Sequence, residues 1–150
     1  MAFHTPGGGE IQLKAYEEYL PDNGVFVDRF DQWSPAFGSY DLVHFFSCIG
    51  GSIAFCGFVK SLGLPLLISP NLWITEKTKH LYPVEEIRSQ LLLSDGIVVN
   101  SDMEGDVLSQ VLNVQRDRFY TVYNAVDQHF FLKSDPSLFC KNYKLIDHLF

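Results

Sequence analysis

The heptapeptide His-Thr-Pro-Gly-Gly-Gly-Glu at residues 4–10 is the most informative segment of the chain. Two apolar residues, Ala2 and Phe3, precede it, and between residues 11 and 20 apolar side chains recur at helical spacing. This pattern predicts a strand, a glycine-rich turn and the N-terminus of a helix. Glycine lets a ligand approach the main chain closely, and the unpaired N–H groups of a helix N-terminus favour an anion such as a diphosphate. A tight turn without a ligand is the alternative, because the P-loop lysine and the full dinucleotide-binding spacing are missing.

Composition and charge limit the class of protein. The chain has 150 residues, which is enough for one domain with a buried core. Hydrophobic residues make up 47% and charged residues 19%, which is typical of a globular protein. The net charge of −7 argues against a nucleic-acid partner and against a polybasic membrane anchor. We expect no transmembrane helix and no signal peptide, and therefore a cytoplasmic protein whose membrane association is at most peripheral.

The chain contains three cysteines, Cys48, Cys56 and Cys140. Their number is odd, their spacing is not that of a metal site, and their neighbours are apolar. We therefore expect buried free thiols in a reducing compartment, and no bound metal. A catalytic cysteine is the less favoured alternative.

Strands and helices alternate along the rest of the chain. After the opening strand, the predicted strands cover residues 25–30, 41–46, 64–69, 96–100 and 118–123. Helices are predicted over residues 52–62 and 84–93, and again from Ser101, because Ser101 and Glu104 have the spacing of a capping box. Alternation of this kind indicates an α/β protein with an open parallel sheet and helices on both faces.

A strand order of 2-1-3-4-5-6 is the arrangement we expect. Ligands of such sheets bind at the carboxyl ends of the strands, where the strand order reverses. The reversal would fall between the opening strand and the strand at residues 41–46. The glycines at 7–9 and at 50–51 would then lie on one crevice.

Four motifs occur along the chain in a characteristic order. They are Pro-Gly-Gly-Gly-Glu at 6–10, Tyr-Asp-Leu-Val-His at 40–44, Val-Val-Asn-Ser-Asp-Met-Glu at 98–104, and Val-Tyr-Asn-Ala-Val-Asp at 122–127 with Phe130 or Phe131 after it. Together they resemble the N-terminal domain of a retaining glycosyltransferase of family 4, which has the GT-B fold. The resemblance spans nearly the whole chain. It implies a Rossmann-like, acceptor-side domain at residues 1–131, followed at 132–150 by an interdomain linker or the start of a C-terminal domain that this chain lacks.

The resemblance also implies a reaction. Enzymes of the family that this chain resembles have two Rossmann-like domains. The first receives the acceptor, and the second holds the nucleotide sugar. The sugar is transferred with retention of configuration and without a metal or another cofactor. The implied partners are a nucleotide-sugar donor and a sugar or lipid-linked acceptor, for example in polysaccharide biosynthesis. Because the donor-binding domain is missing, we expect the 150-residue chain alone to be inactive.

Site residues follow from the same resemblance. Gly7, Gly8 and Gly9 would approach the donor diphosphate, and His44 is a possible catalytic residue. Contacts with the sugar or the acceptor are implied for Glu10, His44, Phe46, Gly50, Gly51, Asn71 and Trp73. One departure is visible, because many members carry His-x-His where this chain has His44-Phe45-Phe46. A phenyl ring therefore replaces the second imidazole.

Several of these residues also have a purely structural interpretation. His44 could be a hydrogen-bonded core histidine, and Glu10 is favoured in any first helical turn. A capping box accounts for Glu104, and a turn accounts for Asn124. Trp73 could pack against a neighbouring domain.

Two other functions remain open at the level of sequence. A noncatalytic Rossmann-like module that binds sugar phosphates, or regulates a longer relative, would need no second domain. An NAD enzyme is disfavoured because the glycines at 7–9 do not form G-x-G-x-x-G, although Asp28 and Asp31 fall near a ribose-binding position.

Overall fold

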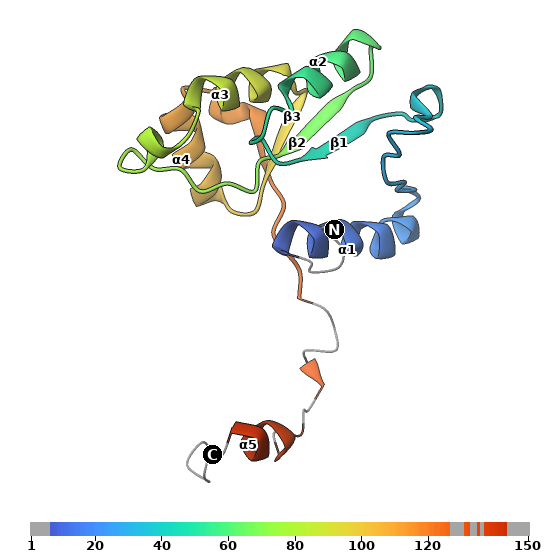
Figure 1. Ribbon diagram of the computed structural model, residues 1–150, viewed down its shortest axis with the longest axis vertical. Helices are drawn as coiled ribbons and strands as arrows, with labels where there is room; N and C mark the ends of the chain where they lie inside the picture. The colour runs from blue at the N-terminus through green and yellow to red at the C-terminus, as the bar shows by residue number, and fades with distance from the viewer. Residues whose placement is uncertain (1–6, 127–130, 133–134, 136, 144–150) are drawn as a thin grey trace.

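The computed structural model describes residues 7–126, 131–132, 135 and 137–143. Its centre is a parallel sheet, shown in Figure 1, whose four strands follow one another in the order of the chain. The strands are β1 (Val43–Phe46), β2 (Leu66–Ser69), β3 (Gly96–Val99) and β4 (Phe119–Thr121). All three pairs are parallel, with Phe45 opposite Ile68 and Ile68 opposite Ile97. This is an α/β architecture consistent with a Rossmann-like fold.

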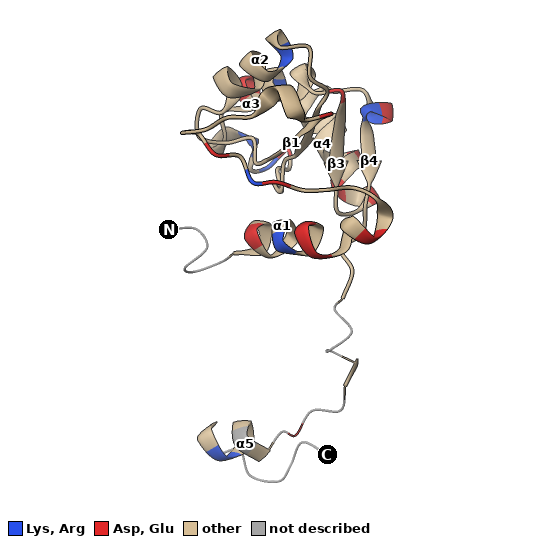
Figure 2. Ribbon diagram, turned by 90° about the vertical axis from the view of Figure 1, so that its right-hand side faces the viewer, with Lys and Arg blue, Asp and Glu red and all other residues tan. Residues whose placement is uncertain are grey.

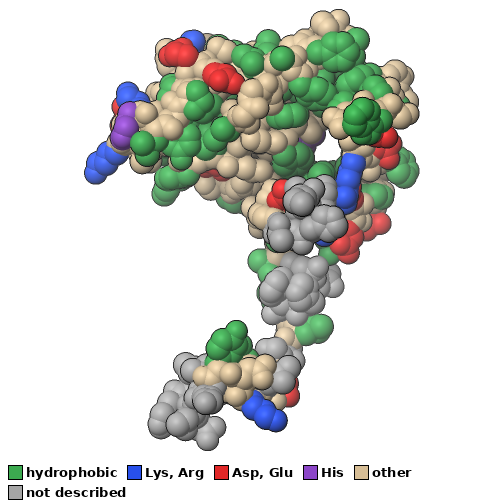
Figure 3. All heavy atoms as spheres, viewed as in Figure 1, with side chains coloured by type: hydrophobic (Ala, Val, Ile, Leu, Met, Phe, Trp, Pro, Cys, Tyr) green, Lys and Arg blue, Asp and Glu red, His purple; other side chains and the backbone are tan. Residues whose placement is uncertain are grey.

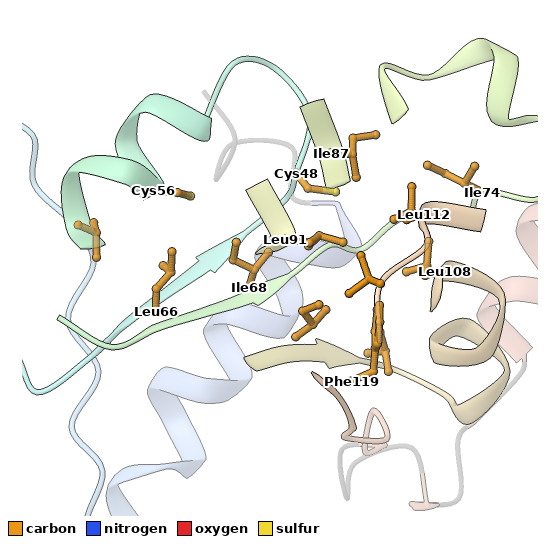
Figure 4. Packing of buried hydrophobic residues seen from close by; sticks show 14 residues of the cluster. Cys48, Cys56, Leu66, Ile68, Ile74, Ile87, Leu91, Leu108, Leu112 and Phe119 are labelled. Atoms are coloured by element: carbon orange, nitrogen blue, oxygen red, sulfur yellow. The ribbon is translucent and has the colours of Figure 1, made fainter. Parts of the chain in front are cut away.

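Three helices connect successive strands. They are α2 (Ile53–Ser61), α3 (Val84–Leu93) and α4 (Asp102–Leu112). Because right-handed crossovers between strands in sequential order return on the same side, these helices cover one face of the sheet. The core lies between that face and the three helices, as Figure 4 shows. Its largest fully buried side chains include Leu66, Ile68, Ile97, Ile87, Leu91, Leu108 and Leu112.

The opposite face carries the first helix, α1 (Gly8–Tyr19), which lies as a separate layer beyond the strands in Figure 2. Side chains alternate between the two faces of a strand, so His44 and Phe46 point away from the core that Phe45 joins. The ring of Tyr16 in α1 lies 5.6 Å from His44 and 5.7 Å from Phe46, centroid to centroid. Helices therefore occupy both faces, with three on one side and α1 on the other.

The four strands predicted from residue 41 onward and the three helices between them are present with bounds shifted by a few residues at most. The helix expected at 84–93 is α3 itself, and Ser101 caps α4 as expected, because its Oγ accepts the N–H of Glu104 at 3.1 Å. The left-handed Asn113, with φ of 50°, ends α4. Apolar runs and capping residues were sufficient signals here because each acts locally.

The strand predicted at residues 25–30 is wrong. This segment forms no strand in the structure, and Phe26 is 86% exposed. Phe30 instead packs against the rings of Phe37 and Phe55, with centroids 5.5 Å and 5.0 Å away. Aromatic contacts with the region of α2 thus replace sheet pairing, and the alternating pattern was misleading.

The strand order is confirmed for predicted strands three to six, whereas the place given to strand two is wrong, because residues 25–30 form no strand. Predicted strands three to six correspond to β1 to β4, in the expected sequence. The opening strand at residues 2–3 lies outside the described residues, so the reversal of strand order stays a prediction.

The remaining helix, α5 (Ser137–Tyr143), lies apart from the sheet in Figure 1. Its Phe139 and Tyr143 rings are 4.7 Å apart. In the described part of the chain, no helix is long and apolar enough to cross a membrane. On the face drawn in Figure 3, the cationic side chains are scattered and form no stripe.

All three cysteines are free thiols. Cys48 and Cys56 are buried, as predicted, whereas Cys140 in α5 is half-buried. Burial raises the pKa of the Cys48 thiol to about 12, and the nearby Glu104 carboxylate acts in the same direction. Cys48 is therefore protonated at neutral pH and unsuited to nucleophilic attack.

Candidate functional site

A cavity of about 480 Å³ lies where the N-terminus of α1 meets the loops that follow β2, β3 and β4. The carboxyl ends of parallel strands meet at one edge of a sheet, and ligands of open α/β sheets bind there. The lining combines polar backbone and carboxamide groups with apolar surface in nearly equal parts. The residues that line it are Gly8, Gly9, Gln12, Asn71, Leu72, Trp73, Asn100, Glu104 and Asn124.

The α1 wall of this cavity is a helix N-terminus made of glycine. Gly7 is the N-cap residue in extended conformation, and the Glu10 carboxylate accepts its N–H at 2.9 Å. The N–H groups of the first turn have no partner within a helix. Gly8 and Gly9 bring those groups to the cavity, where they can donate to an anion.

The fold itself does not require glycine at positions 8 and 9. Both residues are helical, and neither has a positive φ. A Cβ added at Gly8 would meet no atom within 4 Å, and one at Gly9 would lie 3.6 Å from Asn71 Nδ2, an ordinary contact. Glycine in a helix costs about 0.5–1 kcal/mol relative to alanine. The open space at Gly8 is therefore a feature of the cavity and not of the packing.

Four carboxamides connect α1 to the three loops. Gln12 Nε2 donates to Asn100 Oδ1 at 3.1 Å and to Asn124 Oδ1 at 3.3 Å. Asn100 Nδ2 donates to Asn71 Oδ1 at 3.4 Å. Asn71 has a φ of 47°, in the left-handed region that asparagine tolerates well. The network places one amide from each of four chain segments on the same cavity.

Glu104 lies beneath this network. Its Oε2 accepts the N–H of Asn100 at 2.7 Å, and its carboxylate also accepts the N–H of Leu72. Burial raises the pKa of Glu104, and these two hydrogen bonds act in the opposite direction. The Glu104 side chain thus connects the loops after β2 and β3. This is a larger role than capping the N-terminus of α4.

His44 does not line the cavity. Its Nε2 lies 2.9 Å from Ser69 Oγ, and its ring stacks on Phe46 with centroids 4.4 Å apart. Burial lowers the pKa of His44 to about 4, so the imidazole is neutral at physiological pH. This geometry matches the interpretation of His44 as a hydrogen-bonded core histidine. Phe46, like His44, packs against Tyr16 of α1.

The other residues singled out from the sequence fall into three groups. Gly8, Gly9, Asn71 and Trp73 line the cavity, and Trp73 is half-exposed there. Gly7 and Glu10 form the cap of α1 beside it. Gly50 and Gly51 have φ values of 90° and 80° and are exposed, but neither lines the cavity.

Five lining residues were not among the site residues expected from the sequence: Gln12, Leu72, Asn100, Glu104 and Asn124. A signal existed for Gln12, because it lies four residues after Gly8 and so on the same helix face. A signal existed for Asn100 as well, because it directly follows the last residue of β3. Nothing in the sequence marks Leu72, whose backbone N–H is bonded to the Glu104 carboxylate.

Comparison with known proteins adds no identification. A scan against models of protein families, a search of curated proteins and a search of solved structures each found no match to this chain. Fold and site together define an α/β protein with a four-stranded parallel sheet and a polar cavity at the carboxyl ends of its strands.

Proposed function

We propose that this chain is the acceptor-side domain of a retaining glycosyltransferase that uses a nucleotide-sugar donor. The observation that carries the proposal is the shared cavity, into which the glycine N-terminus of α1 and the loops after three parallel strands open together. The resemblance of the four sequence motifs to family 4 of the GT-B glycosyltransferases supports the same function. Three of these motifs, at residues 6–10, 98–104 and 122–127, contribute residues to the cavity wall.

The chemistry assigned to this domain is binding and charge stabilisation. The first-turn N–H groups at Gly8 and Gly9 would donate to the diphosphate, whose negative charge grows as the glycosidic bond to the donor breaks. Donors fixed in place before the reaction stabilise such charge without reorganising. Trp73 and the carboxamides would hold the acceptor. His44 has no part in this proposal, since it is neutral, hydrogen-bonded and outside the cavity.

The test is a transfer assay on the polypeptide isolated from its natural source, after its intact mass has been measured. We expect a mass clearly above the 17.1 kDa of this chain, and sugar transfer from one of a panel of UDP-, GDP- and ADP-linked hexoses with retained anomeric configuration. Binding of a nucleotide sugar without transfer to any acceptor would favour the noncatalytic module instead. Failure to bind any nucleotide sugar would contradict the proposed function.

A further inference from the structure

The lining of the cavity has the chemistry of an uncharged, hydroxyl-bearing ligand. A carboxamide offers both donors and acceptors, and so does a hydroxyl group. Four carboxamides, Gln12, Asn71, Asn100 and Asn124, face this space. Their mutual hydrogen bonds measure 3.1, 3.3 and 3.4 Å, at or beyond the long end of the usual range. Bonds of this length are readily exchanged for bonds to a ligand.

The charge of the cavity points the same way. Among the described residues that line it, none is a lysine, an arginine or a histidine, and Glu104 is the single titratable side chain. The Glu104 carboxylate is held in place by the N–H groups of Asn100 and Leu72. Because no cationic side chain stands beside it among the described lining residues, this carboxylate disfavours an anionic ligand, since like charges repel across an interface.

Trp73 adds an aromatic surface beside the amides. Its side chain is 50% exposed although the residue lines the cavity. An exposed indole presents an apolar face with a polar edge. Such a face suits the C–H side of a saturated sugar ring, whose hydroxyl groups would then point toward the carboxamides.

We propose that the carboxamide part of the cavity takes an uncharged, hydroxyl-rich ring, and that Glu104 is the specificity-determining residue that excludes anionic rings. This inference deepens the proposed function and rests on it, because it concerns the acceptor at the same site. Among the described lining groups, the first-turn N–H groups of α1 are the ones that attract an anion. The diphosphate therefore belongs at Gly8 and Gly9, and the uncharged ring belongs at the amides.

The experiment compares four probes with the same sugar ring: a neutral methyl hexoside, its 6-sulfate, its uronate and its 6-amino analogue. The set of four is prepared once each for glucose, galactose and mannose. Binding to the ¹⁵N-labelled chain at pH 8 is followed by the indole and carboxamide cross-peaks. The Trp73 indole is assigned with Trp33→Phe, which changes a side chain that is 87% exposed and outside the cavity. We expect at least one neutral hexoside to bind at least tenfold more tightly than its sulfate and its uronate.

Glu104→Gln then tests the residue itself. The amide keeps one oxygen acceptor but removes the charge, so the ratio of the sulfate's affinity to that of the neutral hexoside should rise at least threefold over the wild-type ratio. Asp106→Asn, at an exposed residue of the same helix that does not line the cavity, is the matched control and should change neither affinity. Circular dichroism establishes that each variant is folded; if Glu104→Gln is not, the four wild-type probes decide the question.

Each other outcome overturns the inference. Sulfates or uronates that bind as tightly as the neutral hexosides would show that Glu104 does not select against anions. A 6-amino analogue that binds most tightly would show that the site takes a cation. No binding by any neutral hexoside would remove the site. A parallel titration with the nucleotide-sugar panel reports on Gly8 and Gly9, so failure of the proposed function is seen separately.

Discussion

Replacing Gly8 by valine separates the two parts of the account, because it should affect the ligand and not the fold. A Cβ at this position meets no protein atom within 4 Å and points into open space. Glycine and valine differ by about 0.5 kcal/mol or less in helix propensity. We therefore expect the free energy of unfolding of Gly8→Val, measured in urea, to stay within about 0.5 kcal/mol of the wild-type value.

Ligand binding should respond much more strongly. The valine side chain would occupy the space through which a diphosphate approaches the first-turn N–H groups. Hydrogen bonds to charged groups contribute about 1.5–3 kcal/mol each, and 1.4 kcal/mol corresponds to a factor of about ten in affinity. Loss of one such bond predicts that a nucleotide sugar binds at least tenfold more weakly in isothermal titration calorimetry.

Gly38→Val is the matched control for this variant. A Cβ added at Gly38 would also meet no atom within 4 Å, and this residue has no positive φ, but it lies outside the cavity. The affinity of Gly38→Val for the nucleotide sugar should equal that of the wild type. Unchanged binding by Gly8→Val, or an equal loss in both variants, would refute the assignment of the diphosphate to α1.

Three further predictions concern stability. Leu91→Ala should lower the free energy of unfolding, measured in urea, by about 2–5 kcal/mol, because Leu91 is fully buried. Leu92→Ala, at a side chain that is 41% exposed, should lower it far less. Equal losses in the two variants would contradict the packing of α3. Ser101→Ala removes the cap of α4 and should lower the free energy of unfolding by about 1 kcal/mol. Ser89→Ala, at an exposed residue of α3, should leave it unchanged. Equal melting temperatures for the two variants would argue against the cap. His44 has a folded-state pKa of about 4, below its ordinary value of about 6.5, so the unfolded chain binds the extra proton first as pH falls. The stability contributed by neutral His44 is complete above about pH 6.5 and is lost as the pH falls toward 4, by at most about 3 kcal/mol; denaturation of His44→Gln across this range should lack that component, and an identical pH dependence would refute it.

The parts of the fold that were predictable are those with local causes. The apolar runs ending at Phe46, Ser69 and Val99 are strands whose inner face packs against the crossover helices, and their hydrophobicity alone indicates a strand. The cap at Ser101 depends on residues within the same turn. By contrast, the segment at 25–30 alternates like a strand, yet the ring of Phe30 finds partners in Phe37 and Phe55. Such tertiary contacts are not visible in the segment's own pattern.

The site was partly predictable for the same reason. Gly8, Gly9, Asn71 and Trp73 were singled out and line the cavity, since glycine clusters and loop residues after strands are visible in sequence. The bonds between Gln12 and Asn100, 88 residues apart, depend on how α1 sits against the loops. Glu104 was assigned only to a cap, because the contact of its carboxylate with Leu72 crosses between loops.

If α1 and the strand loops form one ligand site, a nucleotide sugar bound to the full-length polypeptide should perturb both, and a ¹⁵N–¹H spectrum recorded during titration with the nucleotide-sugar panel would show this. We expect one member of the panel to shift the backbone signals of Gly8 and Gly9 together with the side-chain amides of Asn71 and Asn100. Signals around Gly50 and Gly51, outside the cavity, should stay in place. Shifts confined to other parts of the chain, or none with any nucleotide sugar, would contradict it.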